Sequence, residues 1–103
     1  MMQVKLRADE RIDRLYSKDI SIIQSPEVFS FSLDAVLLAD FAKVSSKRIK
    51  EVVDLCAGNG AVGLFLSEAT TAHITMIEIQ QRLADMAKRS VLLNDLEGKI
   101  TVI

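Results

Sequence analysis

The sequence predicts an α/β fold in which helices alternate with the strands of a parallel sheet. Apolar residues recur at helical and strand spacing in turn, a glycine-bearing turn links a buried strand to a helix, and the following strand ends on an acidic residue. Strands that follow one another through helices are joined by right-handed crossovers, which build a parallel sheet. We therefore expect residues 32–103 to form the first, three-stranded half of an α/β domain, preceded by a lead-in segment at residues 1–31.

The lead-in segment contains two short patterns. Asp9–Lys18 mixes charged residues with three apolar residues at helical spacing, which is typical of a helix. Ile20–Gln24 is a β-branched run that Ser25 and Pro26 end, which indicates a short strand.

A helix is predicted over about Leu33–Val44. Ser32 suits the N-cap, and Asp34 lies in the first turn, where the helix dipole favours a carboxylate. The apolar face of this helix is expected at Val36, Leu37, Phe41 and Val44.

The remaining elements follow from periodicity. Glu51–Leu55 is predicted to be the first strand of the sheet, and the adjacent Val52 and Val53 indicate burial on both faces. After it we expect a helix over Ala61–Glu68, a strand over His73–Ile79, a helix over Gln80–Asn94 and a strand over Lys99–Ile103. The apolar face of the longer helix is expected at Leu83, Met86, Ala87 and Val91.

Composition argues against several classes of function. The formal net charge is −1, so overall charge gives no argument for a phosphate backbone or an anionic membrane as partner. No apolar run approaches the roughly 20 residues of a membrane span, and the N-terminus lacks the apolar core of a signal peptide. One cysteine and one histidine do not suffice for a zinc site. We expect a cytoplasmic protein without a metal or a membrane.

A glycine motif stands where the first strand meets its helix. Gly58, Gly60 and Gly63 satisfy G-x-G-x-x-G between a strand and a helix, the context that a nucleotide-type ligand requires. Glu78 ends the next strand, 18 positions after Gly60, where a carboxylate accepts hydrogen bonds from a ribose. The sequence therefore predicts a Rossmann-like ligand site.

Asp54, four positions before Gly58, discriminates between ligands. A dinucleotide pyrophosphate would face this carboxylate, with repulsion on the order of several kcal/mol at a partly buried site. S-adenosylmethionine has no phosphate and carries an ammonium and a sulfonium, so the same acid attracts it. The alternative is that Asp54 only braces the loop through local backbone amides.

Three stretches resemble class I S-adenosylmethionine-dependent methyltransferases. Asp54–Gly60 resembles the first motif of that class, and Ile77-Glu78-Ile79 resembles the second. The run Ile22–Ala39 resembles the segment before the glycine loop in bacterial tRNA1(Val) adenine-37 N6-methyltransferases of the small-domain type. The resemblance extends from about residue 11 to residue 103.

The resemblance implies how the methyl donor lies. Its methionine part is expected near Asp54 and Gly58, its ribose on Glu78, and the segment around Phe31 folded over it. Helix capping explains Ser32 and Asp34 equally well, and Cys56 is expected to be a small packing residue. The expected donor-binding residues are Phe31, Ser32, Asp34, Asp54, Cys56, Ala57, Gly58, Asn59, Gly60, Glu78 and Ile79.

The activity that the resemblance implies is N6-methylation of adenine in tRNA. Amino-methyltransferases of this family carry an Asn-Pro-Pro-aromatic motif after the fourth strand, and Pro26 is the single proline here. We therefore expect a truncated, N-terminal donor-binding piece without catalytic residues, inactive alone, with tRNA held by the missing part. The alternatives are a stand-alone module that binds S-adenosylmethionine or a partner, and a nicotinamide-dependent oxidoreductase domain.

The first strand is expected to be an exposed edge in a polypeptide of residues 1–103. In the strand order that the resemblance implies, Glu51–Leu55 lies in the middle of the sheet beside a fourth strand that this chain lacks. An unprotected edge rich in valine and leucine favours pairing with another chain. We predict dimerisation or aggregation, measured by light scattering; a stable monomer with strongly protected amides at residues 52–55 would contradict this.

Overall fold

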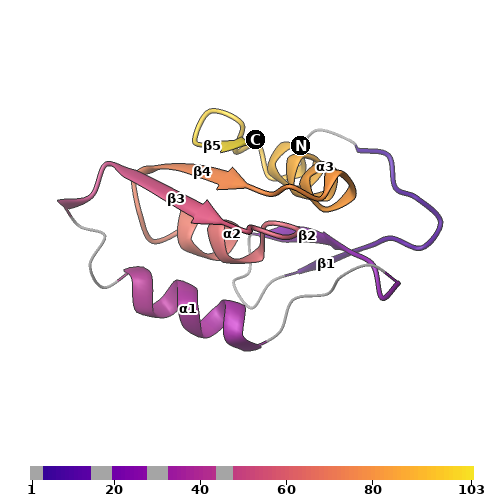
Figure 1. Ribbon diagram of the computed structural model, residues 1–103, viewed down its shortest axis with the longest axis horizontal. Helices are drawn as coiled ribbons and strands as arrows, with labels where there is room; N and C mark the ends of the chain where they lie inside the picture. Colours follow the sequence, from indigo (N-terminus) through magenta and orange to yellow (C-terminus); the bar gives the residue numbers. More distant parts are fainter. Residues whose placement is uncertain (1–3, 15–19, 28–32, 44–47) are drawn as a thin grey trace.

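The computed structural model describes residues 4–14, 20–27, 33–43 and 48–103 (Figure 1). The elements in chain order are β1 (Arg11–Arg14), β2 (Ser21–Gln24), α1 (Leu33–Lys43), β3 (Glu51–Leu55), α2 (Ala61–Ser67), β4 (His73–Ile77), α3 (Gln81–Leu93) and β5 (Ile100–Val102). None of the helices in these ranges has the length and apolar character that crossing a membrane requires.

The strands β3, β4 and β5 form a parallel sheet in that order. α2 connects β3 to β4, and α3 connects β4 to β5. Leu55 lies opposite Ile77, so β3 and β4 reach their carboxyl ends side by side. The predicted α/β, Rossmann-like fold is confirmed, and this shared edge is where a ligand can approach both strand ends.

One face of the sheet carries the hydrophobic core. Met76 of β4 is fully buried and packs with Leu64 of α2. Gly63 permits this close approach, because a Cβ at that position would lie 2.4 Å from Met76 Cε. The apolar face predicted for α3 is confirmed, since all four of its positions are buried: Leu83, Met86, Ala87 and Val91.

The opposite face of the sheet is open. Val53 is 56% exposed, Leu55 is 69% exposed, and Ile103, which follows β5, is 66% exposed. The prediction that β3 is buried on both faces is therefore wrong. Its alternate residues Val52 and Asp54 are only half-buried, on the face that the described helices cover. β3 is also an edge of this sheet, as expected from the sequence.

α1 packs on α2 through small residues. Figure 1 shows α1 on the far side of α2 from the sheet. Ala39 is buried and Ala35 packs against the core, whereas Leu37 is 57% exposed and Phe41 is 77% exposed. The helix is confirmed, but its predicted apolar face is wrong. Alanines at positions 35, 39 and 42 share one helix face and let two helices approach closely, which leaves the large side chains outside. Val44 lies outside the described residues.

The lead-in segment forms an antiparallel hairpin. Arg11–Arg14 is strand β1 and pairs with β2, with Ile12 opposite Ile23. The helix expected within Asp9–Lys18 is therefore wrong for these residues. Ile22 and Ile23 of β2 are fully buried, whereas Ile12 is 43% exposed. Pairing with the buried strand β2 thus decides the conformation of Arg11–Arg14 and outweighs the weak helical spacing of its apolar residues. The strand expected at Ile20–Gln24 is confirmed.

Four charged side chains tie the N-terminal segment to α3. Arg89 donates to both carboxylate oxygens of Glu10, at 2.6 and 2.9 Å, and Arg82 donates to both oxygens of Asp9, at 2.8 and 2.6 Å. The Glu10 side chain is fully buried. Arg89 lowers the pKa of Glu10 to about 2. We call Asp9, Glu10, Arg82 and Arg89 the N-terminal clamp.

The N-terminal clamp makes the stability of the fold depend on pH in the acidic range. Because the pKa of Glu10 falls from 4.5 to about 2 in the folded chain, its contribution to stability is complete above pH 4.5 and is lost as the pH falls toward 2. We expect Glu10→Gln to lower the free energy of unfolding at pH 7 by about 1–3 kcal/mol, because Arg89 loses its buried charged partner and keeps only the more exposed Asp85. Urea denaturation at several pH values measures this. The exposed Glu97→Gln is the control; equal effects of the two variants would contradict the clamp.

Candidate functional site

The loop after β3 is built from left-handed backbone conformations. Cys56 has φ 59°, Gly58 has φ 60° and Gly60 has φ 94°. Glycine adopts such angles without steric cost, whereas Cys56 pays about 1–2 kcal/mol for its conformation. α2 begins directly after Gly60. The loop therefore turns sharply from the sheet into the helix and presents its backbone.

Glu78 joins this loop to the next strand end. The Gly58 N–H donates to Glu78 Oε1 at 2.8 Å, and the Gln80 N–H donates to Glu78 Oε2 at 2.9 Å. The Ala57 N–H adds a backbone bond to the Ile77 carbonyl at 2.9 Å. Sequence reasoning treated Glu78 as a ribose acceptor only. Each oxygen retains capacity for a second hydrogen bond, so the carboxylate can brace the loop and accept from a ligand.

Asn59 lies fully buried between the two loop glycines. Its Nδ2 donates to the Ile23 carbonyl of β2 at 3.0 Å, whereas its Oδ1 has no hydrogen-bond partner in the part of the chain that the structure describes. Sequence reasoning placed Asn59 in the loop but missed its contact with the hairpin. The two residues are 36 positions apart, and no local pattern indicates such a contact.

A cavity of about 320 Å³ opens at the carboxyl ends of β3 and β4. This volume is at the lower end of the range for small-molecule sites, about 300–1,000 Å³. Its lining residues are Ala35, Cys56, Ala57, Gly58, Asn59, Ala61, Val62, Glu78, Gln80 and Leu83. Open α/β sheets bind their ligands at this edge.

Five of the predicted site residues line this cavity: Cys56, Ala57, Gly58, Asn59 and Glu78. Gly60 is buried at the start of α2, Ile79 is 97% exposed beside the cavity, and Asp34 is exposed next to Ala35. Phe31 and Ser32 lie outside the described residues. Cys56 is exposed, so its prediction as a packing residue is wrong. Sequence reasoning missed Ala35, Ala61, Val62, Gln80 and Leu83, which have no chemical signature of their own.

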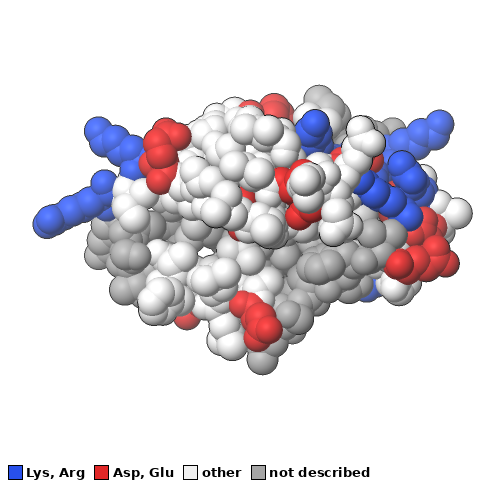
Figure 2. Space-filling view, in the orientation of Figure 1, with Lys and Arg blue, Asp and Glu red and all other residues white. Residues whose placement is uncertain are grey.

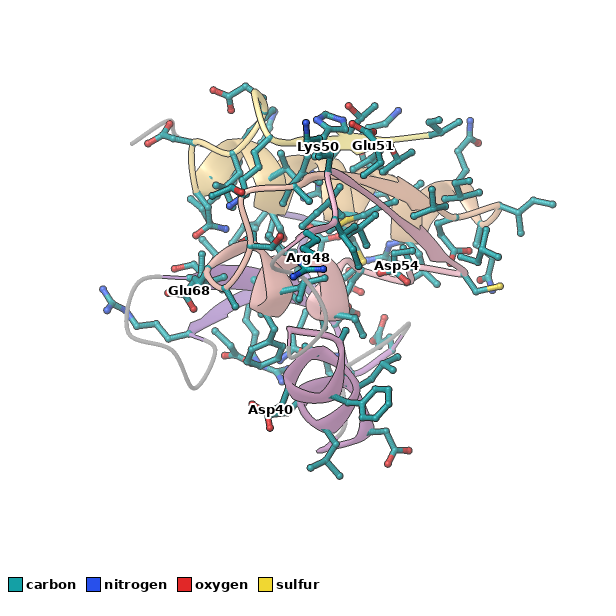
Figure 3. All side chains as sticks on the ribbon, turned by 90° about the vertical axis from the view of Figure 1, so that its left-hand side faces the viewer. Asp40, Arg48, Lys50, Glu51, Asp54 and Glu68 are labelled. Atoms are coloured by element: carbon teal, nitrogen blue, oxygen red, sulfur yellow. The ribbon has the colours of Figure 1, made fainter. Side chains whose placement is uncertain are left out.

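Asp54 lies at the end of β3, on the face of the sheet toward α2 (Figure 3). Its Oδ2 is buried and has no hydrogen-bond partner among the described residues. Burial, and then the nearby charge of Glu78, raise the pKa of Asp54. The Gly63 backbone N–H opposes this rise in pKa, but it is the smallest of the three causes. A cationic ligand group near this oxygen would offset the cost of burying its charge.

Comparisons with known proteins support one family. Residues 19–103 match the model of the family described as Methyltransferase small domain. The fold is similar to that of TYW2 from M. jannaschii in complex with AdoMet, with a TM-score of 0.77, 18% identity, and coverage of 97% of this chain and 45% of that one. It is also similar to the tRNA (uracil-54, C5)-methyltransferase of Pyrococcus abyssi in complex with S-adenosyl-L-homocysteine. There the TM-score is 0.68 at 22% identity, over 92% of this chain and 24% of that one.

A curated relative covers a shorter stretch at higher identity. Protein arginine N-methyltransferase 1.1 of Arabidopsis thaliana is 43% identical over 54 residues, which are 52% of this chain and 14% of that protein. The chain thus spans about a seventh of the length of the curated relatives it matches, and less than half of the solved structures named above.

The unpartnered oxygen of Asp54 allows a test of its charge. We expect Asp54→Asn to weaken binding of S-adenosylmethionine about tenfold, because the amide keeps the shape but not the charge that attracts an ammonium. The fold should remain intact. A raised pKa means that the folded chain binds the proton more tightly, so lowering the pH toward that pKa stabilises the wild type, and the variant lacks this gain.

Calorimetric titration and urea denaturation at pH 5–8 measure the two effects of Asp54→Asn. Glu51→Gln is the matched control, since Glu51 is an exposed acid on the same strand. If Asp54→Asn unfolds the chain, Asp54 is structural, and the charge argument is wrong.

Proposed function

Because the chain belongs to the methyltransferase small-domain family, we propose that its glycine loop binds S-adenosylmethionine and forms the donor-binding part of a methyltransferase. The bound donor supplies a methyl group activated by a positively charged sulfur. The residues of this chain bind and orient it: the loop backbone approaches the methionine part, and Glu78 accepts from the ribose.

The observation that carries the proposal is the pair of acids at the loop. Glu78 lines the cavity, Asp54 buries an unpartnered oxygen near it, and neither lysine nor arginine is among the described lining residues. This negative environment suits a ligand with an ammonium and a sulfonium. It disfavours the pyrophosphate of a nicotinamide dinucleotide, through repulsion of like charges.

We further propose that the methyl acceptor is adenine in tRNA. The support is the run Ile22–Ala39, which resembles tRNA1(Val) adenine-37 N6-methyltransferases. The similarity in fold to a tRNA methyltransferase of P. abyssi agrees with an RNA substrate. Figure 2 shows lysine and arginine at both ends of the molecule with acidic side chains among them. The described residues of that face form no continuous basic patch for phosphates, so the proposal does not assign the RNA contacts to them.

Arginine methylation is the second candidate, favoured by the 43% identity over 54 residues to an arginine N-methyltransferase. Any longer natural form of the chain can be supplied with radiolabelled S-adenosylmethionine and either unmodified tRNA or an arginine-rich protein. The 103-residue chain, which is expected to be inactive alone, serves as the control. Mass spectrometry of the nucleosides should detect N6-methyladenosine. Label on the protein alone would support the second candidate and overturn the first.

Glu78 provides the test of donor binding. We expect Glu78→Ala to weaken binding of S-adenosylhomocysteine at least about tenfold, because it removes both the ribose acceptors and the brace on Gly58. Glu78→Gln keeps one acceptor oxygen and should lose less. Calorimetry measures both, with Glu97→Gln as the exposed control. Unchanged affinity of Glu78→Ala would remove Glu78 from the site, and binding of NAD without S-adenosylhomocysteine would overturn the proposed function.

A further inference from the structure

Side chains take the place of a neighbouring strand along one edge of β2. β1 occupies the other edge. At Ser21, the N–H donates to Asn94 Oδ1 at 2.8 Å, and Asn94 Nδ2 donates to the carbonyl at 2.7 Å. At Ile23, the N–H donates to Ser90 Oγ at 2.9 Å, and the carbonyl accepts from Asn59 Nδ2 at 3.0 Å. These bonds satisfy the backbone groups that a missing strand would leave unpaired.

Asn59 differs from the other two side chains in its place in the fold. Ser90 and Asn94 lie in or directly after α3, whereas Asn59 belongs to the glycine loop of the donor site. Of the bonds that these three side chains make with β2, that of Asn59 links the hairpin to the glycine loop.

The glycine loop is held at two adjacent residues from two different elements. Gly58 is bonded to Glu78 at the end of β4, and Asn59 is bonded to Ile23 of β2. Gly58 and Gly60, on either side of Asn59, both have positive φ angles. Glycines lose the most conformational freedom on ordering, so a tether between them restricts the residues that are hardest to fix.

The buried amide of Asn59 carries a cost. The side chain is fully buried, and none of the described residues donates a hydrogen bond to its Oδ1. An unsatisfied buried acceptor is destabilising, and an apolar residue of similar shape would avoid this. The side chain contributes through the bond that its Nδ2 donates, and that bond acts on the loop.

We propose that Asn59 is a positioning residue for the methyl donor: by donating to the Ile23 carbonyl, it fixes the glycine loop in its binding geometry and makes the β1–β2 hairpin part of the donor site. This inference rests on the proposed function. A loop that is already ordered loses less entropy when the ligand binds, so the tether raises affinity without touching the ligand.

The test compares Asn59→Ala with Asn94→Ala in the 103-residue chain. Both remove a side chain that binds β2, but the hydrogen bonds of Asn94 go to Ser21 and Ser90 and not to the loop. We expect Asn59→Ala to weaken binding of S-adenosylhomocysteine about five- to tenfold. Asn94→Ala should stay within about twofold of wild type, although it lowers the midpoint of urea denaturation. Calorimetry is performed where circular dichroism shows all proteins folded.

Asn59→Asp adds a readout that a purely structural role would not move. At pH 8 the new carboxylate would face the Ile23 carbonyl and could not donate a hydrogen bond to it. We therefore expect Asn59→Asp to bind the donor weakly at this pH. At pH 5.5 the protonated acid can donate to that carbonyl and should recover affinity, since burial favours the neutral form. Asp54 and Glu78 are further acidic side chains near the loop, so each affinity is divided by that of wild type at the same pH. Asn59→Ala should show no such recovery.

The outcomes separate this inference from the proposed function. Wild type that fails to bind S-adenosylhomocysteine overturns the proposed function itself. Two results would overturn only the role of Asn59 when wild type does bind S-adenosylhomocysteine. One is that Asn59→Ala keeps the affinity of wild type. The other is that Asn59→Ala and Asn94→Ala lose affinity equally. If Asn59→Ala does not fold, the test is the affinity of Asn59→Asp relative to wild type at pH 5.5 and at pH 8. The inference is overturned if this relative affinity does not rise at pH 5.5.

Discussion

The carboxylate of Glu78 holds the candidate site together. It accepts from Gly58 at the first strand end and from Gln80 at the second, so one side chain fixes two turns relative to each other. The turn at Gly58 is in a left-handed conformation that glycine adopts readily but keeps only when it is bonded. The cavity lies between these two turns, and its shape therefore depends on this carboxylate.

Burial of the Asp54 carboxylate lowers the stability of the fold but suits the binding of a cationic ligand. A buried carboxylate oxygen that has no partner among the described residues, close to a second acid, is unfavourable for stability. Cys56 adds backbone strain in the same loop. Such costs are common at sites where a ligand supplies the missing partner, and a cationic methyl donor would supply it here. The rest of the fold offsets these costs through the core around Leu64 and Met76.

The N-terminal segment is bonded to α3 and to the glycine loop of the candidate site. The clamp joins Glu10 to Arg89, and side chains from α3 and from the glycine loop complete the open edge of β2. Ile23 is bonded to both of these elements through its own backbone groups. The hairpin therefore connects α3 with the glycine loop after β3. Among the described residues, its strands do not pair with those of the main sheet.

The sequence by itself determined the order of the elements in the sheet, the glycine turn and the two acids beside it, because these depend on local periodicity and on residues close along the chain. Only the tertiary structure decided that Arg11–Arg14 is a strand, that α1 packs through its alanines with Phe41 outside, and that Asn59 binds Ile23. Each of these depends on a partner distant in the sequence. Local patterns describe what one segment favours, whereas burial and pairing depend on which surface another segment offers.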